Sequence, residues 1–133
     1  MNSTPINISE TIKTVLNDLA EFCYLMGSAE TEKFNTDSDV DVAVFWKKDI
    51  SEDQKNNCHI VFEEKFKRDV DLVSLNKIDV IFARQVLETG RLLFCHSKGF
   101  HLNWTMEQMS IYPDFKFSRQ IIEKNILNRK KHV

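Results

Sequence analysis

The sequence predicts an α+β domain that contains a small mixed sheet with flanking helices and a helical C-terminal third. Two observations support this fold class. Segments with apolar residues at three- and four-residue steps are interleaved with short apolar or alternating runs over the first 95 residues, which indicates both helices and strands. Beyond residue 98 only helical patterns remain. Helices gathered around one small sheet are typical of the α+β class.

The chain is the size of one ordinary domain. It has 133 residues, of which 42% are hydrophobic, enough to build a single core. We therefore expect one domain over residues 1–133. In chain order the expected elements are a helix over Ile8–Phe22, strands over Phe22–Met26 and Asp39–Trp46, a helix over Ser51–Phe66, a strand over Asp69–Leu75, a helix capped by Asn76 and running to Thr89, a strand over Arg91–Cys95, and helices over Gly99–Tyr112 and Asp114–Arg129.

Local signals set several of these boundaries. Asn7 and Glu10 have the spacing of a helix cap, and Ser51 and Gln54 have the spacing of a capping box. Gly90 follows the last residue of a helical pattern, where glycine commonly ends a helix. That helix is expected to carry Ile78, Ile81, Phe82 and Val86 on one side.

Charge and cysteine content exclude several classes of protein. Eighteen Lys and Arg face twenty Asp and Glu, so the chain has no net field to attract nucleic acid, and we expect no direct nucleic-acid binding. Three cysteines without a C-x-x-C pair argue against a disulfide framework or a zinc site and favour a cytoplasmic location. No stretch approaches the roughly 20 apolar residues of a membrane span, and no signal peptide is seen.

Two aspartates two residues apart are the most informative feature. Asp39 and Asp41 fall on one face of a predicted strand, because alternate residues of a strand point the same way. Like charges on a strand otherwise lined by apolar residues raise the electrostatic energy unless a cation neutralises them. Oxygen ligands beside substrate phosphates suit magnesium (Mg²⁺), which usually keeps several waters.

A third carboxylate is expected from the strand Asp69–Leu75. Both Asp69 and Asp71 lie on the same face of that strand, and either could be the third carboxylate. We favour Asp71 because it lies within the strand between two apolar residues, where we expect it to be buried. A buried carboxylate beside a metal is placed to accept the proton of an acceptor hydroxyl.

Gly27 and Ser28 end the strand before these aspartates and suggest a phosphate site. A residue without Cβ allows the backbone to come close to a polyphosphate, and backbone amides with the Ser28 hydroxyl can donate to phosphate oxygens. In nucleotidyl transfer, positioning and charge neutralisation by metal ions supply most of the catalysis.

Together these motifs resemble the signature of the DNA polymerase β-type nucleotidyltransferases. Gly27-Ser28 and Asp39-Val40-Asp41 carry this resemblance. Further on, Asp71-Leu72-Val73-Ser74-Leu75 and Val86 to Phe94 resemble the downstream blocks of the minimal nucleotidyltransferases encoded beside HEPN-domain ribonucleases. Met109 to Tyr112 and Phe117 to Gln120 are similar to the C-terminal region of the MntA antitoxins.

The resemblance implies a polymerase β-like fold and an activity. It implies that Asp39 and Asp41 bind Mg²⁺, that Asp71 completes a metal-binding catalytic triad, and that Gly27 and Ser28 hold the nucleotide. It also implies a type VII-like antitoxin, which transfers AMP from ATP to a tyrosine of a cognate HEPN toxin and so neutralises it. The aromatic residues of the helical region of about residues 99–130 are either part of the core or a docking surface for that partner.

One departure from the family pattern leaves alternatives open. After Ser28, members often carry an aromatic, a small, a basic residue and a glycine, whereas this chain has Ala29-Glu30-Thr31-Glu32-Lys33-Phe34. The second hypothesis is therefore a weak or inactive antitoxin that acts by binding its toxin. A third is a small-molecule transferase like those that modify antibiotics, although the chain is short for that role.

Overall fold

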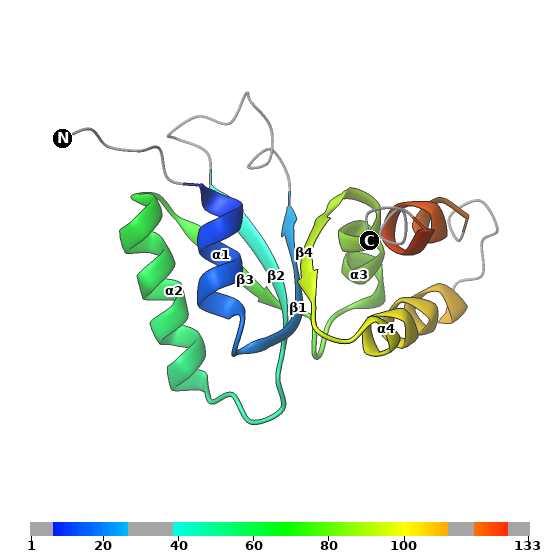
Figure 1. Cartoon of the computed structure of the whole chain (residues 1–133), viewed down its shortest axis with the longest axis horizontal. Helices are drawn as coiled ribbons and strands as arrows, with labels where there is room; N and C mark the ends of the chain where they lie inside the picture. The colour runs from blue at the N-terminus through cyan, green and yellow to red at the C-terminus, as the bar shows by residue number, and fades with distance from the viewer. Residues whose placement is uncertain (1–6, 27–38, 112–118, 128–133) are drawn as a thin grey trace.

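The computed structural model describes residues 7–26, 39–111 and 119–127 (Figure 1). The α+β prediction is confirmed: the described residues form one four-stranded mixed sheet in the order β3-β2-β1-β4, with β2 and β3 parallel and the other neighbours antiparallel. The elements are α1 (Ile8–Leu16), β1 (Ala20–Met26), β2 (Val40–Trp46), α2 (Glu52–Phe66), β3 (Val70–Ser74), α3 (Val80–Thr89), β4 (Arg91–Cys95), α4 (Lys98–Ile111) and the π-helical segment η2 (Ile122–Leu127).

The sheet separates two apolar cores. Helices α1 and α2 cover one face, and α3, α4 and η2 lie on the other (Figure 1). Alternation along the strands divides the side chains: Val40, Val42 and Val44 of β2 belong to the α1/α2 core, while Ala43 belongs to the α3/α4 core. Each strand can therefore place one set of side chains in the α1/α2 core and a chemically different, alternate set on the α3/α4 side.

Local capping signals are confirmed where the partners are close in sequence. Asn7 caps α1, its Oδ1 accepting from the Glu10 amide at 3.0 Å. Ser51 and Gln54 form the predicted capping box, with each side chain accepting from the other's backbone amide. The strand Arg91–Cys95 has the predicted bounds.

The first predicted helix is too long. Helix α1 ends at Leu16, and the chain is already in β1 at Ala20, so the expected helix to Phe22 is wrong in its last residues. Phe22 is a sheet residue whose ring stacks on that of Phe45 of β2 at a centroid distance of 5.1 Å. This pairing with a residue distant in sequence overrides the local helical pattern.

Asn76 does not cap α3, contrary to the prediction. The helix begins at Val80, and Asp79 is its cap, with Oδ1 accepting from the Ile81 amide at 2.7 Å. The Asn76 carboxamide instead accepts from the Trp46 amide at 2.8 Å and donates to the Trp46 carbonyl at 3.0 Å. It thereby extends the β2–β3 pairing beyond the end of β3. Ile81, expected on the packed side, is 69% exposed.

Gly90 ends α3 as predicted, but its φ of −80° is not in the left-handed region. Glycine is required here by close packing, because a Cβ would lie 2.7 Å from the Val86 carbonyl oxygen and 2.8 Å from Met26 Sδ. The same end of α3 receives Lys124 of η2, whose ammonium donates to the carbonyls of Leu87, Glu88 and Gly90.

The C-terminal third is helical over the residues described. Helix α4 runs over Lys98–Ile111 against a predicted Gly99–Tyr112, and residues 119–127 are helical within the predicted Asp114–Arg129. Residues 112–118 and 128–129 of those predictions lie outside the described residues. Over the parts of the chain that are described, no helix combines the length and apolarity needed to cross a membrane.

Candidate active site

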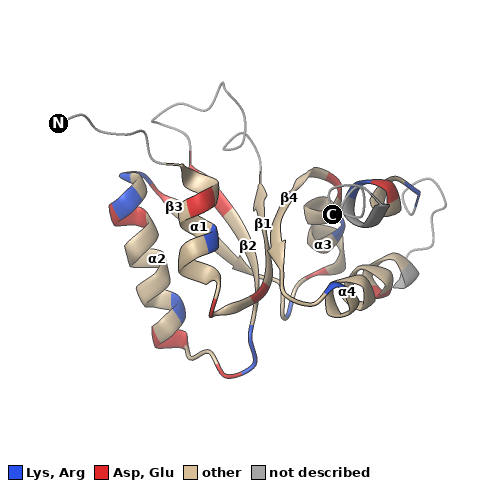
Figure 2. Ribbon diagram, in the orientation of Figure 1, with Lys and Arg blue, Asp and Glu red and all other residues tan. Residues whose placement is uncertain are grey.

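The parallel pairing of β2 and β3 brings two of the predicted aspartates together. In the register of these strands Asp41 lies opposite Asp71. The residues on either side of them, Val40 and Val42 in β2 and Val70 in β3, are buried in the α1/α2 core. Both carboxylates therefore belong to the α3 side of the sheet, since opposite residues of neighbouring strands point the same way. Acidic residues are coloured red along the ribbon in Figure 2.

The electrostatics of the cluster centre on Asp41. This side chain is partly buried, and burial is the largest cause of the raised pKa of its carboxyl. The negative charges of Asp71 and then Asp39 raise that pKa further. The three carboxylates thus lie close enough to repel one another, which a bound cation would relieve.

Asp71 is exposed, which contradicts the expectation that it is buried. The reason is the strand order, since β3 forms an edge of the sheet and has a neighbour on one side only. Asp39 is also exposed and lies just before β2. Asp41, in the strand between β3 and β1, is the most enclosed of the three carboxylates.

The structure also distinguishes Asp71 from Asp69, the other candidate for the third carboxylate. Asp69 precedes β3 and is exposed, and its backbone carbonyl accepts from the Val40 amide at 3.0 Å. Asp71, by contrast, lies directly across from Asp41, and its negative charge raises the pKa of the Asp41 carboxyl more than that of Asp39 does. The geometry therefore favours Asp71.

A cavity of about 220 Å³ opens beside Asp41 and Asp71. Besides the two carboxylates it is lined by residues of three strands and of α3, namely Met26, Val42, Ala43, Val73, Phe82, Gln85 and Thr89. The contribution of α3 was not anticipated from the sequence. Phe82, Gln85 and Thr89 are spaced by three and four residues, so they lie on one face of a helix. The polar residues Gln85 and Thr89 on that face are the sequence feature that could have indicated this part of the cavity lining.

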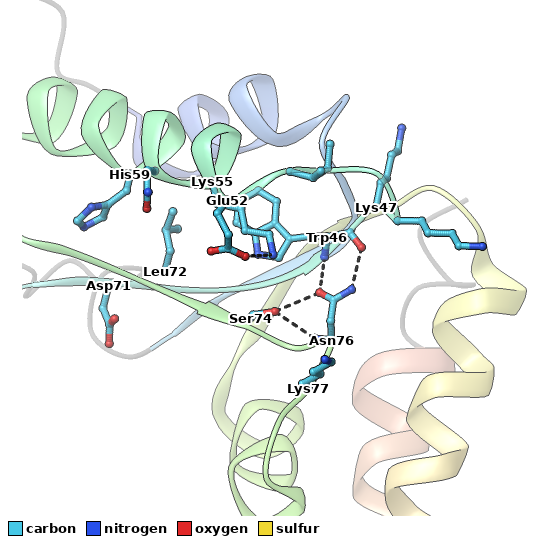
Figure 3. A pocket seen from close by; sticks show the side chains of 13 residues that line it. Trp46, Lys47, Glu52, Lys55, His59, Asp71, Leu72, Ser74, Asn76 and Lys77 are labelled. Atoms are coloured by element: carbon cyan, nitrogen blue, oxygen red, sulfur yellow. Dashed lines mark hydrogen bonds and ion pairs between the residues drawn. The ribbon is translucent and has the colours of Figure 1, made fainter.

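Asp71 also borders a larger cavity of about 610 Å³ on the other side of β3, between this strand and α2 (Figure 3). Its lining includes Trp46, Lys55, His59 and Asn76 but neither Asp39 nor Asp41. Figure 3 shows Asp71 directed away from His59 and Leu72, across the strand. The smaller cavity is therefore the one associated with the carboxylate pair.

The predicted phosphate residues Gly27 and Ser28 lie outside the described residues. The residue before them, Met26, ends β1 and is paired with Asp41 in the antiparallel register.

The carboxylate pair suits a magnesium ion. Over residues 7–26, 39–111 and 119–127, no three Asp, Glu, His or Cys side chains form a group that could hold a metal ion by themselves. Magnesium does not require such a cage, since it is usually bound by one or two carboxylates, waters and substrate phosphates. The oxygen-only chemistry and mutual repulsion of Asp41 and Asp71 fit that mode of binding.

Comparison with known proteins identifies the family. The family profile described as polymerase beta, nucleotidyltransferase matches residues 10–99, which include both strands of the carboxylate pair. The chain therefore belongs to the polymerase β nucleotidyltransferase family. No curated protein gives a significant match by sequence.

Solved structures share the fold over nearly the whole chain. A chain from a toxin–antitoxin crystal structure with AMP-PNP has a TM-score of 0.66 and 23% identity, covering 90% of this chain and 98% of its own. One from the toxin–antitoxin MntA-HepT has 0.62 and 21%, covering 90% and 97%. One from a tri-AMPylated Shewanella oneidensis HEPN toxin in complex with MNT antitoxin has 0.62 and 22%, covering 90% and 96%.

Proposed function

We propose that the chain is an antitoxin that transfers AMP from ATP to a tyrosine of a cognate HEPN-domain toxin. The observation that carries this proposal is the pairing of Asp41 with Asp71 on the sheet of a polymerase β nucleotidyltransferase. The structures similar in fold support the substrate and partner, because one is a toxin–antitoxin complex with AMP-PNP and another contains a tri-AMPylated HEPN toxin.

Each predicted residue has a role in this proposal. Asp39, Asp41 and Asp71 bind Mg²⁺, and Gly27 and Ser28 contact the triphosphate. When bound, magnesium would neutralise the phosphates and stabilise the charge that develops during transfer. The exposed carboxylate of Asp71 is accessible to the acceptor and takes the proton of its hydroxyl.

We also propose that the single domain docks on its toxin through the helical C-terminal third, about residues 99–130, and acts in the cytoplasm. Helix α4 supports the docking surface, because Phe100 is 40% and Met106 49% exposed. Cys23, Cys58 and Cys95 form no disulfide with one another, which supports a reducing compartment.

The test is AMP transfer to the HEPN-domain protein encoded beside this chain. Purified chain, partner, magnesium and ATP labelled at the α-phosphate are incubated, and the partner is analysed by intact mass. Wild type should add AMP-sized mass, and Asp41→Asn and Asp71→Asn should lose transfer by at least about 100-fold, as for other removed catalytic groups. EDTA should abolish the reaction.

Asp69→Asn is the matched control, because it removes an exposed aspartate near the same strand and should leave transfer within about twofold of wild type. Retained transfer by Asp41→Asn contradicts the catalytic proposal. If wild type adds no mass but co-elutes with the partner, the chain acts by binding alone. Transfer to an aminoglycoside in the absence of any partner would instead indicate a small-molecule transferase.

A further inference from the structure

We propose that the 220 Å³ cavity beside Asp41 and Asp71 is the acceptor pocket, which receives one hydroxyl-bearing aromatic ring, and that Phe82 and Gln85 of α3 determine its specificity. This inference rests on the proposed function, because it assigns a place to the group that accepts AMP.

The size of the cavity limits its occupant. Sites for drug-sized ligands usually occupy about 300–1,000 Å³. A cavity of about 220 Å³ has room for a single ring with its substituent but not for a whole nucleoside triphosphate. The rest of any larger ligand must therefore lie outside it.

The lining favours a ring that carries a polar group. Ala43 and Val73 of the sheet and Met26 of β1 provide apolar contacts, and Phe82 offers an aromatic edge or face. Gln85 is exposed and adds a carboxamide that can donate or accept. The carboxylates at the same cavity would meet the hydroxyl of such a ring.

The direction of the cavity favours the acceptor over the nucleobase. Met26 ends β1 beside Asp41, and the proposed phosphate contacts, Gly27 and Ser28, come next in the sequence. The cavity extends the other way along the strands, from Asp41 to Ala43 and from Asp71 to Val73. In phosphoryl and nucleotidyl transfer the attacking and leaving oxygens lie roughly in line on opposite sides of phosphorus. The acceptor therefore enters from the cavity.

The step balances with ATP as the donor. The acceptor oxygen forms a bond to the α-phosphorus, and the bond from that phosphorus to the bridging oxygen of pyrophosphate breaks. Pyrophosphate leaves with the electron pair, and the hydroxyl proton passes to the Asp71 carboxylate. The products are an AMP ester of the acceptor and pyrophosphate.

A binding measurement tests the pocket without turnover. The methionine methyl groups are labelled with ¹³C, and N-acetyl-tyrosinamide is titrated in the presence of magnesium and an ATP analogue with a methylene between the α and β phosphorus atoms. The Met26 signal, assigned with Met26→Leu, should shift, while that of the exposed Met106 on α4 should not. N-acetyl-serinamide should leave both signals unchanged.

Kinetic variants test the specificity residues. Phe82→Leu and Gln85→Ala should each raise the KM for N-acetyl-tyrosinamide by about three- to tenfold, the expected effect of losing one aromatic contact or one hydrogen bond. The Kd for ATP should stay within about twofold. Ile81→Ala is the control, since Ile81 is adjacent in α3 but 69% exposed and does not line the cavity.

The outcomes separate the pocket from the proposed function. A Met26 shift with tyrosinamide but no AMP transfer to any acceptor leaves the pocket in place and removes the transferase proposal. A Met26 shift with adenosine alone, or variants that weaken ATP binding and spare the acceptor KM, would assign the cavity to the base and overturn the inference. Transfer without any tyrosinamide-dependent shift at Met26 would also overturn it.

Discussion

Replacing Gly90 by alanine should destabilise the fold, although its backbone conformation is open to any residue. The φ of −80° excludes a left-handed requirement, so the effect must come from space. The added Cβ would lie 2.7 Å from the Val86 carbonyl oxygen, 2.8 Å from Met26 Sδ and 3.2 Å from Tyr24 Cδ2. The methionine side chain can move, but the carbonyl is fixed because it accepts from the Gly90 amide at 2.8 Å.

The magnitude follows from this one immovable contact. Overpacking a close-packed core typically costs about 1–3 kcal/mol. For a domain of this length that corresponds to a fall in melting temperature of roughly 3–10 °C. The free energy of unfolding, measured by urea denaturation with circular dichroism, should fall by that amount without a change in m-value.

Gly99 in α4 provides the matched control. A Cβ there would meet only Ser97 Oγ, at 3.9 Å. Since alanine is favoured over glycine in a helix by about 0.5–1 kcal/mol, Gly99→Ala should leave stability equal or slightly higher. If Gly90→Ala behaves like Gly99→Ala, the close-packing explanation for Gly90 is refuted.

Four further predictions follow from the structure. Asn76→Ala removes both hydrogen bonds to the Trp46 backbone and should lower the free energy of unfolding by about 1–3 kcal/mol, seen as a lower urea midpoint. In the native protein Cys95, which is partly exposed, should react with a thiol reagent well before Cys58, which is 3% exposed; equal rates would contradict the burial. Burial raises the pKa of Cys58 from 9.0 to about 11, so it contributes stability that is lost as pH rises through that range, a loss that Cys58→Val should reduce. Asp41→Asn should raise the melting temperature while abolishing transfer, because it removes a partly buried charge repelled by two others.

The parts of the fold that sequence predicted well depend on neighbours in the chain. The capping box of Ser51 and Gln54 spans three residues, and both partners are visible in the sequence itself. The same reasoning failed at Asn76, where the sequence offered a helix cap and the structure shows a pairing with Trp46, thirty residues away. A side chain that can satisfy either a local or a distant backbone group cannot be assigned from local spacing.

The sequence predicted that Asp41 and Asp71 share a face of the sheet, but it did not predict how exposed they are. Alternation within β2 and within β3 predicted which face each aspartate occupies, and the register Asp41 to Asp71 agrees with it. Whether Asp71 is buried depends on which strand lies at the edge, and that order is set by how α2 returns the chain to form a parallel pair. No single-strand pattern contains this information.

The division of the sheet into two faces explains why the site can tolerate its own repulsion. On the α1/α2 face of β2 and β3, Val40, Val42 and Val70 belong to the α1/α2 core and are each no more than 4% exposed. These residues hold the two strands in register irrespective of the charges on the opposite face. The folded protein can therefore tolerate the repulsion among the carboxylates. Binding of a cation with a triphosphate would relieve this repulsion, and the fold does not depend on it. On this argument, neutralising Asp41 or Asp71 changes the chemistry and leaves the strand pairing intact.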